Sequence, residues 1–167
     1  MNLVSWNCRG LGTSLKVEAM KYLITMALPD VLLLQETKIE ARNLLTTSNQ
    51  FWKKNAGQAV SARGSSGGLA TLWSKDLFSL ENSFVSQHWI FTELRHFSSK
   101  ITLSLFNLYV PVTFQEKRDC WNSLDVFLAA RNPSNIIVAG DLNIMLAPKA
   151  KKKGGNCGRD PMIRAVE

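Results

Sequence analysis

The feature that most constrains this chain is an apolar run that ends in two polar residues, Ile136-Ile137-Val138-Ala139-Gly140-Asp141-Leu142-Asn143. Its short length and β-branched residues indicate a buried strand and not a helix. Gly140 permits a sharp turn or a close backbone approach. Asp141 and Asn143 follow at the carboxyl end of the strand, where α/β sheets usually hold their ligands. This pair can bind a metal ion, orient a water molecule or do both; the alternative is an ordinary turn, because Asp and Asn both favour turns.

Three other apolar runs end in polar side chains in the same way. Leu3 to Asn7 is predicted to be a strand ending in Asn7, Val31 to Glu36 one ending in Glu36, and Ile101 to Leu108 one that leads into Tyr109. The near-continuous apolar run before Glu36 suits a strand covered on both faces. We therefore expect these strand ends to converge with Asp141 at one site. Taken singly, Glu36 is equally suited to cap a following helix, and Tyr109 to be a half-buried aromatic residue.

The remaining pattern predicts an α/β fold. Thr13 or Ser14 is expected to cap a helix that continues to about Leu28. A second amphipathic helix is expected over Glu116 to Arg131. Further strands are expected at 59–63, 69–73 and 89–94, with the last of these pairing with 101–108, and a helix or irregular connection at 39–51. This order predicts a single domain over residues 1–167, an α/β sandwich of the mixed-sheet type.

The charge of the chain indicates a polyanionic partner. The net charge is +7, from 20 Lys and Arg against 13 Asp and Glu, which favours nucleic acid. Much of the excess follows Asn143, in Lys149, Lys151, Lys152 and Lys153. These lysines either contact phosphate or form a solvated loop. No apolar run approaches the length of a membrane span, no secretory signal is visible, and three widely spaced cysteines fit a reducing compartment.

The residues at the predicted strand ends supply oxygen ligands. Asn7, Glu36, Asp141 and Asn143 offer carboxylate and amide oxygens, without histidine or cysteine, and this set favours Mg²⁺ or Mn²⁺ over zinc. Such a metal neutralises charge on a phosphate oxygen and on a departing alkoxide. Asp141 is suited to take a proton from an attacking water that Asn143 orients. The glycines at 10 and 12 do not form a dinucleotide-binding motif, because position 15 is Leu15.

Four segments resemble, in order, the motifs of the endonuclease/exonuclease/phosphatase family. They are Trp6-Asn7-Cys8-Arg9-Gly10-Leu11, Leu34-Gln35-Glu36-Thr37-Lys38, Asn107-Leu108-Tyr109-Val110-Pro111 and Gly140-Asp141-Leu142-Asn143. The glycines at 67 and 68, and Lys153-Gly154-Gly155 with Arg159-Asp160, further resemble endonuclease domains of LINE-type, non-LTR retrotransposons, particularly those of plants. The resemblance implies a four-layer α/β sandwich, with two mixed sheets packed face to face and helices outside.

The resemblance also implies roles for the candidate residues. Glu36 is the expected principal magnesium ligand, with Asn7 beside it in the metal and phosphate site, and Tyr109 is expected to support the transition state through its hydroxyl. Asp141 would activate the water, and Asn143 would position it or a catalytic histidine. The expected contacts to the nucleic-acid backbone are Arg9, Lys38, Lys151, Lys152 and Lys153. In retrotransposons such a domain nicks target DNA to create a primer, which implies an intracellular, nuclear location.

One family motif has no counterpart here. The family's last motif is a Ser-Asp-His, whereas the histidines of this chain are His88 and His96 in mid-chain, which we interpret as ordinary surface or partly buried residues. The family domain normally continues beyond the motif that contains Asp141, so the chain is expected to be truncated, with an incomplete second sheet and an unpaired edge.

Two functional interpretations remain open from the sequence. The first is a magnesium-dependent phosphodiesterase that nicks DNA. The second is a catalytically inactive retrotransposon remnant that at most binds nucleic acid. A small-molecule phosphatase is a third interpretation, which the basic charge disfavours. The sequence gives no indication of the oligomeric state.

Overall fold

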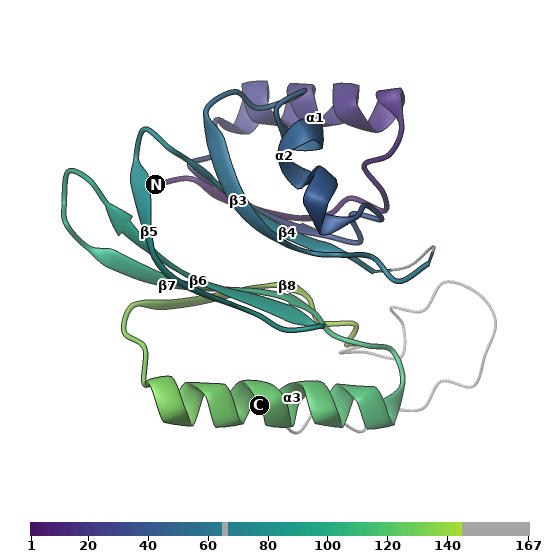
Figure 1. Cartoon of the computed structure of the whole chain (residues 1–167), viewed down its shortest axis with the longest axis vertical. Coiled ribbons are helices and arrows are strands. Elements are labelled where there is room, and N and C mark those ends of the chain that lie inside the picture. Colours follow the sequence, from purple (N-terminus) through teal and green to yellow (C-terminus); the bar gives the residue numbers. More distant parts are fainter. Residues whose placement is uncertain (65–66, 145–167) are drawn as a thin grey trace.

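The polypeptide is arranged in four layers, with helices outside two facing sheets (Figure 1). The computed structural model describes residues 1–64 and 67–144. The first sheet has the order β1 (Leu3–Asn7), β2 (Val31–Gln35), β4 (Leu69–Ser74), β3 (Asn55–Val60), and the second the order β5 (Phe78–Val85), β6 (Trp89–His96), β7 (Thr102–Tyr109), β8 (Ile136–Asp141). The helices are α1 (Ser14–Ala27), the 3-10 turn η1 (Ala41–Asn43), α2 (Leu44–Ser48) and α3 (Phe114–Arg131). The predicted α/β sandwich with two mixed sheets is confirmed.

Threonine caps fix the starts of the two long helices. The Thr13 side chain accepts a hydrogen bond from the backbone N–H of Lys16, and Thr113 does the same for Glu116. The predicted bounds of α1 are confirmed. The second helix begins two residues before the predicted Glu116, because Thr113 caps it there. No helix in the described ranges is long and apolar enough to cross a membrane.

Three apolar clusters separate the four layers. The first lies between α1 and the first sheet and includes Met20, Leu32 and Leu34. The second lies between the two sheets, and the third packs β6 and β7 against α3. The middle cluster contains Val31, Leu33, Trp73, Phe78, Leu94 and Leu105. Since residues 31 to 34 alternate between the first two clusters and are all fully buried, β2 is covered on both faces, as its apolar run predicted.

Two parallel strand pairs bring the candidate residues to one edge of the sandwich. In the first sheet β1 runs parallel to β2, and Asn7 is opposite Gln35. In the second sheet β7 runs parallel to β8, and Tyr109 is opposite Asp141. Gly140 is in tight contact with the neighbouring strand, because a Cβ atom there would lie 2.0 Å from the carbonyl oxygen of Leu108. The expected close backbone approach at Gly140 is thereby confirmed.

Three strand expectations need correction. β3 begins at Asn55, four residues before the predicted 59–63 segment, and β5 was not predicted. β8 is only half buried: Ile137 and Ala139 pack between the sheets, whereas Ile136 and Val138 are 46% and 50% exposed. The reason is that β8 is an outer strand in the described part of its sheet. The expected incompleteness of that sheet stays a prediction, because residues 145–167 lie outside the described part.

Candidate active site

A single amide group joins the ends of the two sheets. Nδ2 of Asn7, the last residue of β1, donates hydrogen bonds to Oε1 of Glu36 at 2.8 Å and to Oδ2 of Asp141 at 2.6 Å. Glu36 follows β2 directly, and Asp141 ends β8. All three side chains are partly buried. The structure therefore brings together three of the predicted site residues, although they come from opposite sheets.

The turn after β8 holds Asp141 from a second side. The backbone N–H of Asn143 donates to Oδ1 of Asp141 at 3.0 Å, and its side-chain Nδ2 donates to the carbonyl oxygen of Val110 at 2.7 Å. The carbonyl oxygen of Asn143 accepts a hydrogen bond from Nζ of Lys117 at 2.8 Å. Lys117 lies on α3 and is only 4% exposed. This buried cation, which sequence reasoning missed, fixes the turn that carries Asn143.

Tyr109 lies beside both carboxylates. Its pKa is raised from the ordinary value of 10.0, first by burial, then by the negative charges of Glu36 and Asp141, and by a side-chain hydrogen bond with Glu36. The phenol is therefore protonated at neutral pH. In that form its single O–H can donate one hydrogen bond. The Glu36 carboxylate accepts it here, so a phosphate oxygen would receive it only after the hydroxyl turns away from Glu36.

Unfavourable backbone conformations gather at this site. In the described part of the chain nine residues other than glycine have a positive φ, and four of them are Arg9 (50°), Glu36 (52°), Lys38 (54°) and Asn143 (47°). Such conformations cost free energy and persist where the surrounding structure holds them. Here the backbone N–H of Gly10 donates to the carbonyl of Glu36 at 2.7 Å, and that of Lys38 to the carbonyl of Gly67 at 3.1 Å.

The donor set suits a magnesium-type ion. Mg²⁺ is commonly held by one or two carboxylates and otherwise by water and phosphate oxygens, and Glu36 and Asp141 supply two. Among the described residues no group of three or more His, Cys, Asp and Glu side chains is gathered at one place.

Asn7 and Asn143 act as hydrogen-bond donors at this site, which the sequence did not indicate. Asn7 presents its amide nitrogen to the carboxylates, and its Oδ1 accepts a hydrogen bond from the backbone N–H of Arg9 at 3.3 Å. The Asn143 amide nitrogen faces Val110. In this orientation Asn7 holds the two carboxylates as a donor, and becomes an oxygen ligand only if its amide rotates. The roles of both asparagines as ligands stay predictions.

A buried hydrogen bond joins the two sheets next to the site. Gln35 on β2 donates from Nε2 to Oδ1 of Asn107 on β7 at 2.7 Å, and Asn107 donates from Nδ2 to the carbonyl oxygen of Ala70 at 2.9 Å. Gln35 and Asn107 are 1% and 0% exposed. This link between the sheets lies one residue before Glu36 and two before Tyr109. Sequence reasoning missed it, although a glutamine and an asparagine within otherwise apolar strands are a signal that could have found it.

The predicted basic contacts are only partly described. The side chains of Arg9 and Lys38 are exposed on the loops that flank Asn7 and Glu36, and the Lys38 stem would lie 3.6 Å from a Cβ atom at Gly10. Lys151, Lys152 and Lys153 lie outside the described residues. The contacts of all five with nucleic acid stay predictions.

The two histidines differ in their relation to the site. His96 lies at the end of β6, and its Nδ1 is 3.0 Å from Oγ of Ser99. The backbone carbonyl of His88 accepts a hydrogen bond from the backbone N–H of Tyr109 at 2.8 Å. Burial lowers the pKa of His88 below 6.5, the nearby Glu116 opposes this shift, and Arg63 adds to it. His88 is therefore partly buried next to a candidate site residue, a position set by the pairing of β6 with β7.

Comparison with known proteins identifies relatives by family and by fold. A model of the Endonuclease/Exonuclease/phosphatase family matches residues 4–161. No match to this sequence was found among curated proteins.

Three solved structures illustrate the similarity in fold. A humanized TDP2 from D. rerio has a TM-score of 0.64 and 20% identity, with 87% of this chain and 67% of that chain covered. A Neisseria 3′ phosphatase bound to a product DNA hairpin has a TM-score of 0.68 and 18% identity, with coverages of 88% and 59%. The endonuclease domain of TRAS1, a telomere-specific non-LTR retrotransposon, has a TM-score of 0.66 and 11% identity, with coverages of 87% and 61%. The chain thus spans about three fifths to two thirds of their length.

Proposed function

The chain belongs to the endonuclease/exonuclease/phosphatase family, and from this premise we propose that it hydrolyses phosphodiester bonds in DNA with the help of a bound divalent cation, Mg²⁺ or Mn²⁺. The observation that carries this proposal is the Asn7 amide that joins the Glu36 and Asp141 carboxylates at 2.8 and 2.6 Å. Two carboxylates held together at the edge of a sandwich form a metal and phosphate site, and the net charge of +7 favours a polyanionic substrate.

The finer proposal is a DNA-nicking endonuclease of the non-LTR retrotransposon type. It is supported by the resemblance of the glycines at 67 and 68, and of Lys153-Gly154-Gly155 with Arg159-Asp160, to LINE-type endonuclease domains. A fold shared with the endonuclease domain of TRAS1 is compatible with it. The same proposal includes a similarity to the plant members of this retrotransposon class and a location in the nucleus.

Glu36 and Asp141 are the residues that would hold the cation. Bound there, a divalent cation neutralises charge on the phosphate and on the leaving oxygen. Asn7 keeps the two carboxylates from separating, because one amide nitrogen donates to both. Glu36 makes this bond from a left-handed backbone conformation with φ of 52°, which persists only where the surrounding structure holds it.

The remaining residues act on water and phosphate. Asp141 is oriented by Asn7 through one oxygen and by the backbone of Asn143 through the other, and its remaining lone pairs can accept a proton from an attacking water. The Tyr109 hydroxyl turns away from Glu36 to donate its hydrogen bond to a phosphate oxygen as negative charge develops there. Lys117 fixes the turn behind Asp141 through the carbonyl of Asn143.

Nicking of supercoiled plasmid in Mg²⁺ tests this function. We expect the wild-type chain to convert plasmid to the open circle. Asp141→Asn should be slower by roughly 10²–10⁴-fold, as for loss of a group active in proton transfer, and Glu36→Gln should be slower because it removes a ligand of the cation. Glu18→Gln, an exposed carboxylate on α1, is the matched control and should nick at the wild-type rate.

The same assay distinguishes the competing interpretation. If the wild-type chain nicks plasmid no faster than Glu36→Gln, the proposal is wrong and the inactive remnant is favoured. Hydrolysis of a small phosphomonoester without plasmid nicking would instead favour a phosphatase.

A further inference from the structure

A groove leads away from Tyr109 toward the first turns of α3. It consists of two cavities of about 420 and 410 Å³. Both cavities are lined by Arg63, Gln87, His88 and Glu116. The first also reaches Tyr109, and the second extends to Asp119. The two cavities form one groove because they share four lining residues. Since the first cavity also borders Tyr109, this groove is continuous with the candidate active site.

The groove differs in charge from the rest of the molecule. Its lining carries two carboxylates, Glu116 and Asp119, and one guanidinium, Arg63, whereas the whole chain has a net charge of +7. His88 adds no charge at neutral pH, because burial lowers its pKa below 6.5. An excess of carboxylates repels phosphate and accepts hydrogen bonds from neutral or cationic donors. The groove is thus unsuited to the DNA backbone itself, although it opens directly beside the phosphate site.

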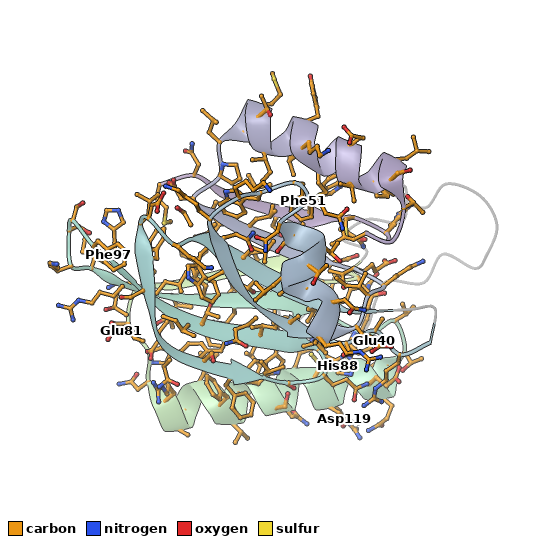
Figure 2. The ribbon with its side chains drawn as sticks, turned by 45° about the horizontal axis from the view of Figure 1, so that its top comes forward. Glu40, Phe51, Glu81, His88, Phe97 and Asp119 are labelled. Atoms are coloured by element: carbon orange, nitrogen blue, oxygen red, sulfur yellow. The ribbon has the colours of Figure 1, made fainter. Side chains whose placement is uncertain are left out.

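Both carboxylates keep acceptor capacity. Oε2 of Glu116 accepts a hydrogen bond at 2.5 Å from Oγ1 of Thr113. The oxygens of Asp119 accept from Nε2 of Gln115 at 3.0 and 3.1 Å. An ionised carboxylate has about four lone-pair positions, so each can bind a further donor. Figure 2 shows His88 and Asp119 at the same end of the molecule, with Asp119 on α3 below the connection between β5 and β6 that carries His88.

We propose that this groove binds the base of an unpaired nucleotide adjacent to the scissile phosphate, with an exocyclic amino group donating to Glu116 and Asp119. Cytosine, adenine and guanine carry such an amino group, and thymine and uracil do not. The groove therefore selects against thymine at the position it contacts. This proposal rests on the proposed function, because it takes the phosphate at Asp141 and Tyr109 as its starting point.

Binding of single-stranded octamers tests the proposal without catalysis. Fluorescein-labelled octamers of deoxycytidine and deoxyuridine are compared by fluorescence anisotropy in EDTA at low salt, since uracil carries a carbonyl oxygen where cytosine carries the amino group. We expect the cytidine octamer to bind the wild-type chain about tenfold more tightly, the discrimination typical of a specific contact to a base edge.

The variants assign that preference to the groove. Glu116→Gln combined with Asp119→Asn should bring the two octamers within about twofold of each other. Glu116→Gln leaves the backbone N–H of residue 116 that donates to the Thr113 cap of α3, so the helix start is retained. Asp125→Asn, an exposed carboxylate of the same helix that does not line either cavity, is the control and should keep the tenfold preference.

Two results would overturn the groove assignment: equal binding of both octamers to the wild-type chain, or a preference that survives in the double variant. Absence of binding to either octamer would overturn it as well. The proposed hydrolysis is judged separately by plasmid nicking, so that a chain that nicks plasmid without base preference retains the proposed function and loses only this inference.

Discussion

The side-chain nitrogen of Asn7 lies 2.6 Å from Oδ2 of Asp141, although 134 positions separate the two residues in the sequence. Among the described residues, Asn7 ends an outer strand of the first sheet, and Asp141 ends an outer strand of the second. Their hydrogen bond joins the two sheets at the edge where β1, β2, β7 and β8 end in polar residues. A shift of one sheet relative to the other would break this bond, so the geometry of the site depends on how the two sheets pack.

The acidity of Tyr109 should reveal the two carboxylates beside it. The chain has two tyrosines, and Tyr22→Phe, at a position 69% exposed, leaves Tyr109 as the one observed. Tyrosinate absorbance should then give a pKa above 10.0. Glu36→Gln should lower this pKa, because it removes one negative charge and weakens the hydrogen bond.

The sign of this shift sets a pH window for stability. Because the folded protein holds the Tyr109 proton more tightly than the unfolded chain, the unfolding free energy should fall as the pH rises from about 10 through the pKa of the folded state. A Tyr109 that titrates below 10 in the folded chain, or that is unaffected by Glu36→Gln, contradicts the described geometry.

Gly140→Ala should destabilise the fold strongly. The new Cβ atom would lie 2.0 Å from the Leu108 carbonyl oxygen, at a backbone φ of +145°. Since backbone atoms of the adjoining strand cannot rotate away, we expect a loss of about 3 kcal/mol in urea denaturation. Gly12→Ala has no atom within 4 Å of its Cβ and should change stability by less than about 0.5 kcal/mol. Equal stability of the two variants would argue against the tight contact of β7 with β8.

The contact between Gln35 and Asn107 should appear as a coupling energy. Replacing Asn107 by Leu leaves the buried Gln35 amide without its 2.7 Å acceptor, at a cost of about 1–3 kcal/mol. Gln35→Leu together with Asn107→Leu should cost less than the two single changes added, with a coupling of about 1–2 kcal/mol.

A pair of residues that do not contact each other, Gln35 and Asn55, serves as the control for this double-mutant cycle. Asn55 is buried at the start of β3 and bonds with Ser48 and Asn49. Gln35→Leu and Asn55→Leu should be additive within about 0.5 kcal/mol. If Gln35 and Asn107 are equally additive, their hydrogen bond does not join the sheets.

Much of the site is predictable because an apolar run with a polar tip reports both a strand and its end. This pattern is enough to identify Asn7, Glu36, Tyr109 and Asp141 as candidates, and parallel pairing of the strands accounts for their meeting. What the pattern cannot report is side-chain orientation. The Asn7 amide presents nitrogen and not oxygen to the carboxylates, and this depends on contacts that only the packed sheets create.

The features that the sequence missed have local causes. β5 contains a bulge between Leu80 and Asn82, which interrupts the alternation by which a strand is recognised. The proximity of His88 to Tyr109 depends on the register of β6 with β7, which the sequence around His88 does not contain. The exposed Ile136 and Val138 of β8 show that a run of β-branched residues does not by itself distinguish an inner strand from an outer one.

The measurement that tests the central claim most directly is Mn²⁺ binding followed by electron paramagnetic resonance. If Glu36 and Asp141 form one site, the wild-type chain should bind Mn²⁺, and Glu36→Gln and Asp141→Asn should each weaken binding by about tenfold or more. Glu18→Gln should bind as the wild type does. Unchanged Mn²⁺ affinity in both site variants would contradict the account, because the two carboxylates would then not share a metal.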